Sequence, residues 1–198
     1  MHRLFVGVAL FASTSVADPT WRGLIVADED RCAPYDRAEY RYPASVEDAT
    51  ISLLGDVVSP YTCELFASKR DTEVDHIVAL SEAHDSGLCR ADAETKRRFA
   101  RDVANLTLAS PSLNRSKGAR DGADWEPEHN RCWFATRIVD VRNAYGLTID
   151  RREADALETI LAGCSSADGR EPHCESRSVF RRVLLPVLGT AARKDNSR

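Results

Sequence analysis

Six cysteines are the feature that most constrains how this chain of 198 residues can fold. They follow an N-terminal stretch with an apolar run at residues 4–11 and small residues before Ala17, which is typical of a signal peptide. We expect residues 1–17 to be removed and the protein to be secreted, either extracellular or periplasmic. No two cysteines form a Cys-X-X-Cys pair, which argues against a zinc knuckle or a thioredoxin-type site. An even number in an exported chain instead predicts three disulfides.

The pairing of the cysteines is open on sequence alone, because six cysteines allow fifteen combinations. We favour pairing between sequence neighbours, namely Cys32–Cys63, Cys89–Cys132 and Cys164–Cys174. The pair Cys132–Cys164 is a serious alternative.

Composition indicates a folded protein outside the membrane. Apolar residues make up 43% of the chain and charged residues 29%, which supports a packed core. No stretch approaches the roughly 20 apolar residues that span a bilayer. The net charge of −4 argues against a generally basic surface. Residues 96–120, however, contain seven basic residues against the single acid Asp102, so this part could attract an anion.

The periodicity predicts a mainly α-helical, single-domain α+β fold around a ββα finger. Polar and apolar residues alternate over 73–78, and a second strand is expected at 105–109. A short helix should begin after Ser110 with Pro111 in its first turn and end at Lys117. Other helices are expected at 45–54, 79–86, 92–104, 128–145 and 150–162. Residues 18–42 are expected to be irregular, and the apolar cluster at 183–188 has no assigned place.

These elements divide the mature chain into three parts. They are an N-terminal irregular and helical segment at 18–58, a core at 59–163 and a C-terminal tail at 164–198. We expect this disulfide-stapled domain to be a monomer.

Four polar residues of the predicted finger could carry chemistry. Asp75 and His76 lie on the first strand, Asn105 is at the second and Asn114 lies on the helix. Carboxylate and amide oxygens are hard ligands suited to Mg²⁺, Mn²⁺ or Ca²⁺. His76 should point to the opposite face of the strand from Asp75, where it could take a proton from water. Glu73 shares the strand face of Asp75.

The sequence around these residues resembles a known family. Asp-His-Ile-Val at 75–78, Asn-Leu-Thr-Leu at 105–108 and Asn-Arg-Ser-Lys-Gly at 114–118 resemble the motif of the His-Asn-His (HNH) endonucleases, in an Asp-His…Asn…Asn variant. The resemblance is closer to secreted bacterial HNH nucleases of the DUF1524 kind and runs from about residue 59 to 163. It implies a ββα-metal finger with phosphodiesterase chemistry on nucleic acid.

The resemblance also implies a role for each matching residue. Asp75 and Asn114 would bind one divalent metal ion, His76 would be the general base, and Asn105 would orient the finger loop or the His76 ring. Asn114 stands where many members have histidine, which favours Mg²⁺ or Mn²⁺ and leaves Ca²⁺ and Zn²⁺ open.

The expected function is therefore a secreted, metal-dependent endonuclease that hydrolyses DNA, with RNA left open. Specificity should be low, because no base-reading module is present. Three basic residues are expected to contact phosphates: Arg115, Lys117 and Arg120. Two alternatives are a non-catalytic disulfide-stapled binding protein and a phosphatase or phosphodiesterase acting on small phosphate esters.

Overall fold

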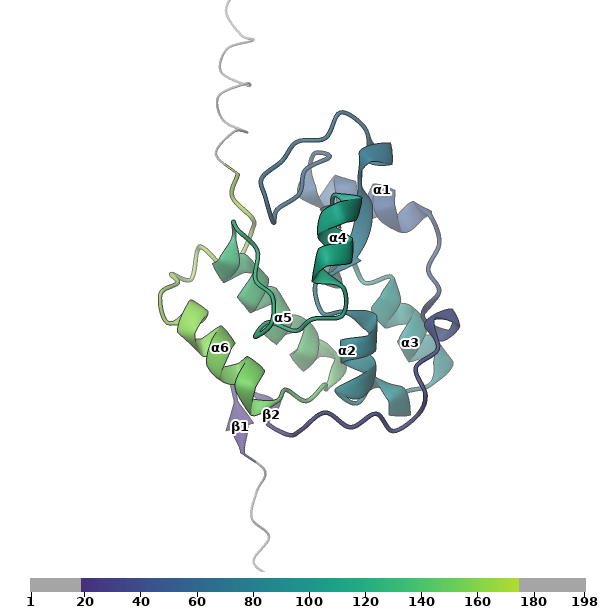
Figure 1. Ribbon diagram of the computed structural model, residues 1–198, viewed down its shortest axis with the longest axis vertical. Coiled ribbons are helices and arrows are strands. Elements are labelled where there is room, and N and C mark those ends of the chain that lie inside the picture. Colours follow the sequence, from purple (N-terminus) through teal and green to yellow (C-terminus); the bar gives the residue numbers. More distant parts are fainter. Residues whose placement is uncertain (1–18, 175–198) are drawn as a thin grey trace, which may run out of the picture.

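A computed structural model describes residues 19–174. The α-helices are α1 (Ser45–Leu54), α2 (Leu80–Asp85), α3 (Ala93–Ala100), α4 (Pro111–Lys117), α5 (Arg131–Tyr145) and α6 (Arg151–Leu161). The strands are β1 (Thr20–Trp21), β2 (Leu24–Ile25), β3 (Glu73–His76) and β4 (Leu106–Ala109). Four short 3₁₀ turns lie at Arg37–Tyr40, Lys69–Asp71, Leu88–Arg90 and Val103–Asn105. Figure 1 shows the mainly helical α+β fold that the sequence predicts.

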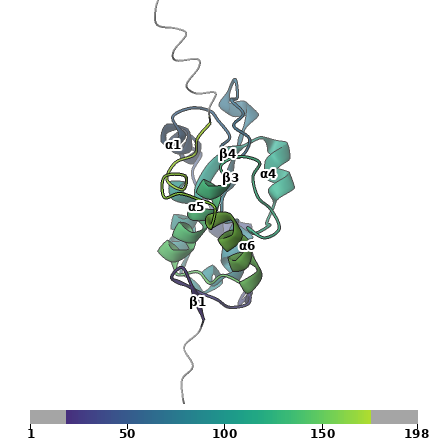
Figure 2. The ribbon, with the colours of Figure 1, turned by 90° about the vertical axis from the view of Figure 1, so that its left-hand side faces the viewer.

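The predicted ββα finger is confirmed. β3 and β4 pair antiparallel, with Asp75 opposite Thr107, and α4 follows β4 directly and lies beside the strands (Figure 2). The Ser110 side chain accepts a hydrogen bond from the Leu113 amide, and Pro111 occupies the first turn of α4. These local signals start the helix where the sequence predicts it.

The helix predicted over 92–104 is shorter in the structure. Asp92 caps α3 by accepting a hydrogen bond from the Thr95 amide, as expected, but α3 ends at Ala100. Asp102 then accepts from the Ala104 amide and caps a 3₁₀ turn. Aspartate side chains compete in this way with helical hydrogen bonds, so the chain leaves the helix and enters β4.

The C-terminal helices α5 and α6 pack against each other and carry much of the core. α6 begins at the predicted cap, where Asp150 accepts a hydrogen bond from the Glu153 amide. α5 begins three residues later than predicted, because Asn130 precedes it with a left-handed φ of 54°. Phe134 of α5 and Leu157 of α6 lie in the same apolar core as Phe99 of α3.

The N-terminal segment is more ordered than its composition suggests. Residues 18–42 were expected to be irregular, yet β1 and β2 form a hairpin whose turn is Arg22-Gly23. Both turn residues have positive φ, 48° and 88°, as two-residue hairpin turns require. A bridge between Val26 and Ile149 attaches this hairpin to the segment before α6. The two strands of the hairpin are only two residues long, and the bridge joins residues distant in sequence, so no periodic pattern indicates them.

Three disulfides are present, but the favoured neighbour pairing is wrong. The pairs are Cys32–Cys89, Cys63–Cys174 and Cys132–Cys164. The alternative Cys132–Cys164 is confirmed, because contact between α5 and α6 brings the start of one helix near the end of the other.

Two expectations fall outside the described part of the chain, namely the signal peptide at 1–17 and the placement of residues 183–188. Within residues 19–174, no helix is long and apolar enough to cross a membrane.

Candidate active site at the end of the finger

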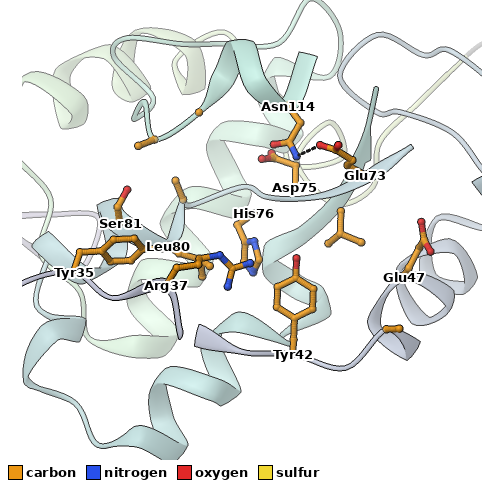
Figure 3. A pocket seen from close by; sticks show the side chains of 15 residues that line it. Tyr35, Arg37, Tyr42, Glu47, Glu73, Asp75, His76, Leu80, Ser81 and Asn114 are labelled. Carbon is orange, nitrogen blue, oxygen red and sulfur yellow. Dashed lines mark hydrogen bonds between the residues drawn. The ribbon is translucent and has the colours of Figure 1, made fainter. Parts of the chain in front are cut away.

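A cleft of about 520 Å³ surrounds the end of β3 (Figure 3). Asp75 and His76 extend from the two sides of the strand, as the alternation predicts, and both line the cleft. Asn114 of α4 lies on the Asp75 side. Arg37 and Tyr42 lie on the His76 side and belong to residues 32–44, a segment with one 3₁₀ turn that we call the strap. The cleft therefore has one wall from α4 and another from the strap.

Asp75 is held by two donors. Its side chain is 5% exposed, and the Tyr61 hydroxyl donates to Oδ2 over 2.7 Å. The Lys117 ammonium lies 3.4 Å from Oδ1 and 3.3 Å from Oδ2. Burial raises the pKa of the Asp75 carboxyl, whereas Lys117 and Tyr61 act in the opposite direction. The Asp75 carboxylate is thus fixed in place, although its distances to the Lys117 ammonium are longer than those of a short hydrogen bond.

Lys117 does not occupy the position expected of a phosphate ligand. Its side chain is completely buried, and its ammonium donates to the His76 carbonyl over 2.7 Å. The ring of Trp125 lies 5.8 Å away. The face of α4 that carries Asn114 also carries Lys117, and at Lys117 this face packs inward against β3. Burial therefore contradicts the expected phosphate contact of Lys117.

Arg115 and Arg120 are exposed, but neither lines the cleft. Arg120 donates to the Lys117 carbonyl over 3.1 Å. Their expected contact with phosphates stays a prediction.

The His76 ring is held by a hydrogen bond that also fixes the position of its proton. Its Nε2 lies 2.9 Å from the Ala100 carbonyl oxygen, and a carbonyl only accepts, so Nε2 carries the proton. Burial lowers the pKa of His76 to about 3, and the charges of Arg37 and Lys117 act in the same direction. The imidazole is therefore neutral at ordinary pH, and its lone pair lies on Nδ1.

Asn105 supports the loop that follows β3. Its Oδ1 accepts from the Val78 amide over 2.8 Å, and its Nδ2 donates to the Val78 carbonyl over 3.1 Å. Its own carbonyl accepts from the Ile77 amide over 2.8 Å. Asn105 is fully buried and does not line the cleft. These contacts favour an orienting role for Asn105.

The side chains around Asn114 suit a hard cation. Asn114 Nδ2 donates to Glu73 Oε2 over 2.9 Å, which leaves the amide oxygen for another partner (Figure 3). Glu73, Asp75 and Glu47 all line the cleft, and Arg37 is the only cation among the described residues that do so. Three carboxylates against one guanidinium favour an added positive charge. These oxygen donors fit Mg²⁺, Mn²⁺ or Ca²⁺, whereas the six cysteines are all used in disulfides.

Sequence reasoning missed the contribution of the strap. Arg37 and Tyr42 lie more than 30 residues before the finger motif in an apparently irregular segment, and no spacing relates them to His76. His84, which belongs to no motif of the sequence, is fully buried and hydrogen-bonded to the strap. Only the tertiary structure shows these relationships.

The fold and cleft together define an α+β protein in which a ββα finger places a carboxylate, an amide and a neutral histidine at one opening. The chain belongs to the family described as GmrSD restriction endonucleases, C-terminal domain, which matches residues 45–159. An uncharacterized secreted protein of Arthroderma benhamiae is 27% identical over 123 residues. The match covers 60% of this chain and 60% of that protein. No solved structure matches the chain.

Proposed function

We propose that this protein is a secreted, metal-dependent endonuclease that hydrolyses phosphodiester bonds in DNA with low sequence specificity, RNA being open as a second substrate. The observation that carries the proposal is the convergence of Asp75, Asn114 and a neutral His76 on one cleft. Membership of a restriction-endonuclease domain family supports the reaction class. The three disulfides and the secreted relative are consistent with an exported protein.

In this mechanism His76 activates the attacking water. Nδ1 accepts a proton while the water oxygen forms a bond to phosphorus and the bond from phosphorus to the 3′ oxygen breaks. The 3′ oxygen leaves with the electron pair of that bond and takes a proton from solvent. The Ala100 carbonyl holds the ring through Nε2 and stabilises the imidazolium that results. Asn105 fixes the loop beyond His76 and acts as a positioning residue.

Asp75 and Asn114 would hold the divalent cation, with Glu73 beside them. When bound, the cation supplies positive charge to the phosphate and to the departing oxygen. Lys117 already shares Asp75, so we expect the free protein to bind Mg²⁺ weakly. A phosphate in the cleft would add a ligand and a negative charge, so metal and nucleic acid should strengthen each other's binding.

The first experiment incubates the protein with supercoiled plasmid and Mg²⁺, with and without a chelator. We expect nicking that the chelator stops. Phosphate release from a small ester without nicking would replace the proposal with a phosphatase, and the absence of both reactions would leave a binding protein.

The second experiment tests the base. His76→Ala should lower turnover by at least about 10²-fold, the scale of a positioned general base. His129→Ala is the control, because His129 is exposed and does not line the cleft. Near-parental cleavage by a folded His76→Ala protein would remove His76 from the mechanism.

A further inference from the structure

The strap forms the His76 wall of the cleft although it lies before the family match. The match begins at residue 45, whereas Tyr35, Arg37 and Tyr42 of the strap line the cleft. Figure 3 shows Arg37 and Tyr42 on the side of His76 that faces away from Asn114. Residues outside the matched domain therefore complete its cleft.

The strap is firmly attached although a single 3₁₀ turn is its only regular structure. Cys32 at its start is bonded to Cys89. Both ring nitrogens of the buried His84 are used on the strap, Nε2 with the Ala33 carbonyl and Nδ1 with the Tyr40 hydroxyl, each over 2.8 Å. Two ion pairs add to these contacts: Lys96–Glu39 in the strap and Arg31–Asp85 directly before it. Contacts from α2 and α3 thus fix the position of this segment.

This attachment presents Arg37 to the cleft. One of its terminal nitrogens, Nη1, donates to the Tyr40 carbonyl over 2.7 Å, and the guanidinium centre lies 5.3 Å from the Tyr42 ring. The Tyr42 ring also lies 5.5 Å from the His76 ring. Arg37 is exposed, so its remaining N–H groups are open to a ligand.

The charge balance of the cleft indicates what Arg37 would bind. A phosphodiester entering the cleft meets three carboxylates, and a cation held by Asp75 and Asn114 can offset them only on the α4 side. On the His76 side, Arg37 is the one positive charge among the described lining residues. A planar guanidinium suits paired hydrogen bonds to phosphate oxygens.

We infer that the strap is a substrate-binding element and that Arg37 binds the non-bridging oxygens of the phosphodiester beside His76. The inference rests on the proposed function and adds a second wall to its site. Because the disulfide and His84 hold the strap in place, Arg37 is largely ordered before substrate arrives, which reduces the entropy lost on binding.

The experiment compares three single variants of the full chain. Arg37→Gln keeps a donor for the Tyr40 carbonyl but loses the charge, and Arg37→Lys keeps the charge. Arg41→Gln is the matched control, because Arg41 lies in the same strap and is exposed but does not line the cleft. KM and kcat are measured on plasmid over a range of salt concentrations. Binding of a labelled DNA duplex with Mg²⁺ is measured in the His76→Ala background.

Arg37→Gln should raise KM and the duplex Kd about 10-fold with a small change in kcat, as expected for a lost charged hydrogen bond. The dependence of log Kd on log salt should fall by about one unit, because one phosphate contact is lost. Arg37→Lys should lie between Arg37→Gln and the parent, and Arg41→Gln should match the parent.

Three results would overturn the inference. They are an unchanged Kd in Arg37→Gln, an equal effect in Arg41→Gln, and equal losses of affinity and melting temperature in both Arg37 variants. Equal losses in both Arg37 variants would mean that Arg37 has only a structural role, through its hydrogen bond to the Tyr40 carbonyl. If the parent does not nick plasmid, the proposed function fails separately, and the duplex-binding comparison still decides the role of Arg37.

Discussion

Lys117 and Arg142 are both completely buried, yet their surroundings differ. Arg142 donates to Glu82 over 2.6 Å and to Glu153 over 2.5 Å, and also to the Ser86 hydroxyl over 2.8 Å. Neither carboxylate lines the cleft at the finger. Lys117 stands at least 3.3 Å from Asp75, whose carboxylate does line that cleft.

The difference shows how one fold uses buried charge in two ways. The Arg142 cluster joins α2, α5 and α6 by short bonds, so it acts as a structural clamp. In the Asp75–Lys117 pair, one side of the carboxylate faces a cleft where another cation can approach. Breaking the first should mainly affect folding, and changing the second should mainly affect ligand binding and reaction.

Arg142→Met should have the largest effect on stability. It leaves Glu82 and Glu153 buried without their cation, and breaking a buried pair in this way costs about 3–5 kcal/mol. Chemical denaturation measures the loss, with Arg151→Met as the control because Arg151 is an exposed arginine of α6. A loss below about 1 kcal/mol would mean that the cluster is not a clamp.

Asn114→Ala should have the largest effect on activity at little cost in stability. Asn114 is half-buried and offers its amide oxygen to the cleft, so cleavage in Mg²⁺ should fall by about 10²-fold or more. Asn114→His should retain some activity and shift the preference towards zinc, nickel or cobalt. Asn143→Ala, an exposed asparagine of α5, is the control. Parental cleavage by Asn114→Ala would show that Asn114 holds no metal.

Lys117→Met should show separately how the Asp75–Lys117 pair affects stability and how it affects Mg²⁺ binding. Removing the ammonium leaves Asp75 with Tyr61 as its remaining side-chain donor, and we expect a loss of about 1–3 kcal/mol in unfolding free energy. The Mg²⁺ affinity of the free protein should rise, because one positive charge beside the carboxylate is gone. Calorimetric titration measures the affinity. Weaker Mg²⁺ binding by a folded variant would contradict the idea that Lys117 and the metal ion compete for the Asp75 carboxylate.

The pH dependence of stability should show the smallest effect. Burial raises the pKa of Glu153 to about 7, against an ordinary value near 4.5. The folded state therefore keeps a proton that the unfolded state has lost, and this stability is lost as pH rises through about 7. The loss therefore begins above about pH 4.5 and is complete near pH 7.5, so the melting temperature should fall by about one or two degrees between pH 6.5 and 7.5 and level off above. His76 acts in the opposite direction at the lower end of this range, because its unfolded pKa is near 6.5 and its folded pKa is lower, and its contribution ends above about pH 7.5.

Glu153→Gln tests whether Glu153 causes this fall of melting temperature with pH. The variant cannot lose a proton at this position, so its melting temperature should change less over the same range. An unchanged slope would assign the effect to other groups, such as Glu29, whose pKa burial and the Glu82 charge also raise to about 7.

The sequence predicted those parts of the fold that depend on neighbouring residues. The β3 alternation and the Ser110-Pro111 start of α4 act locally, so they placed Asp75, His76 and Asn114 correctly on their elements. The strap and the disulfides depend on contacts between distant residues, and no local pattern encodes them. Lys117 shows the limit most clearly, because helical spacing relates it to Asn114 but does not reveal which part of that face is buried.

The disulfide connectivity also bears on survival among proteases. The loop closed by Cys32–Cys89 overlaps the loop closed by Cys63–Cys174, and the second contains the whole finger. A single backbone cut anywhere between residues 32 and 174 therefore leaves the two fragments covalently joined. A nicked molecule would migrate as one band on a non-reducing gel and separate into two after reduction, while Asp75, His76 and Asn114 stay within the same covalent molecule.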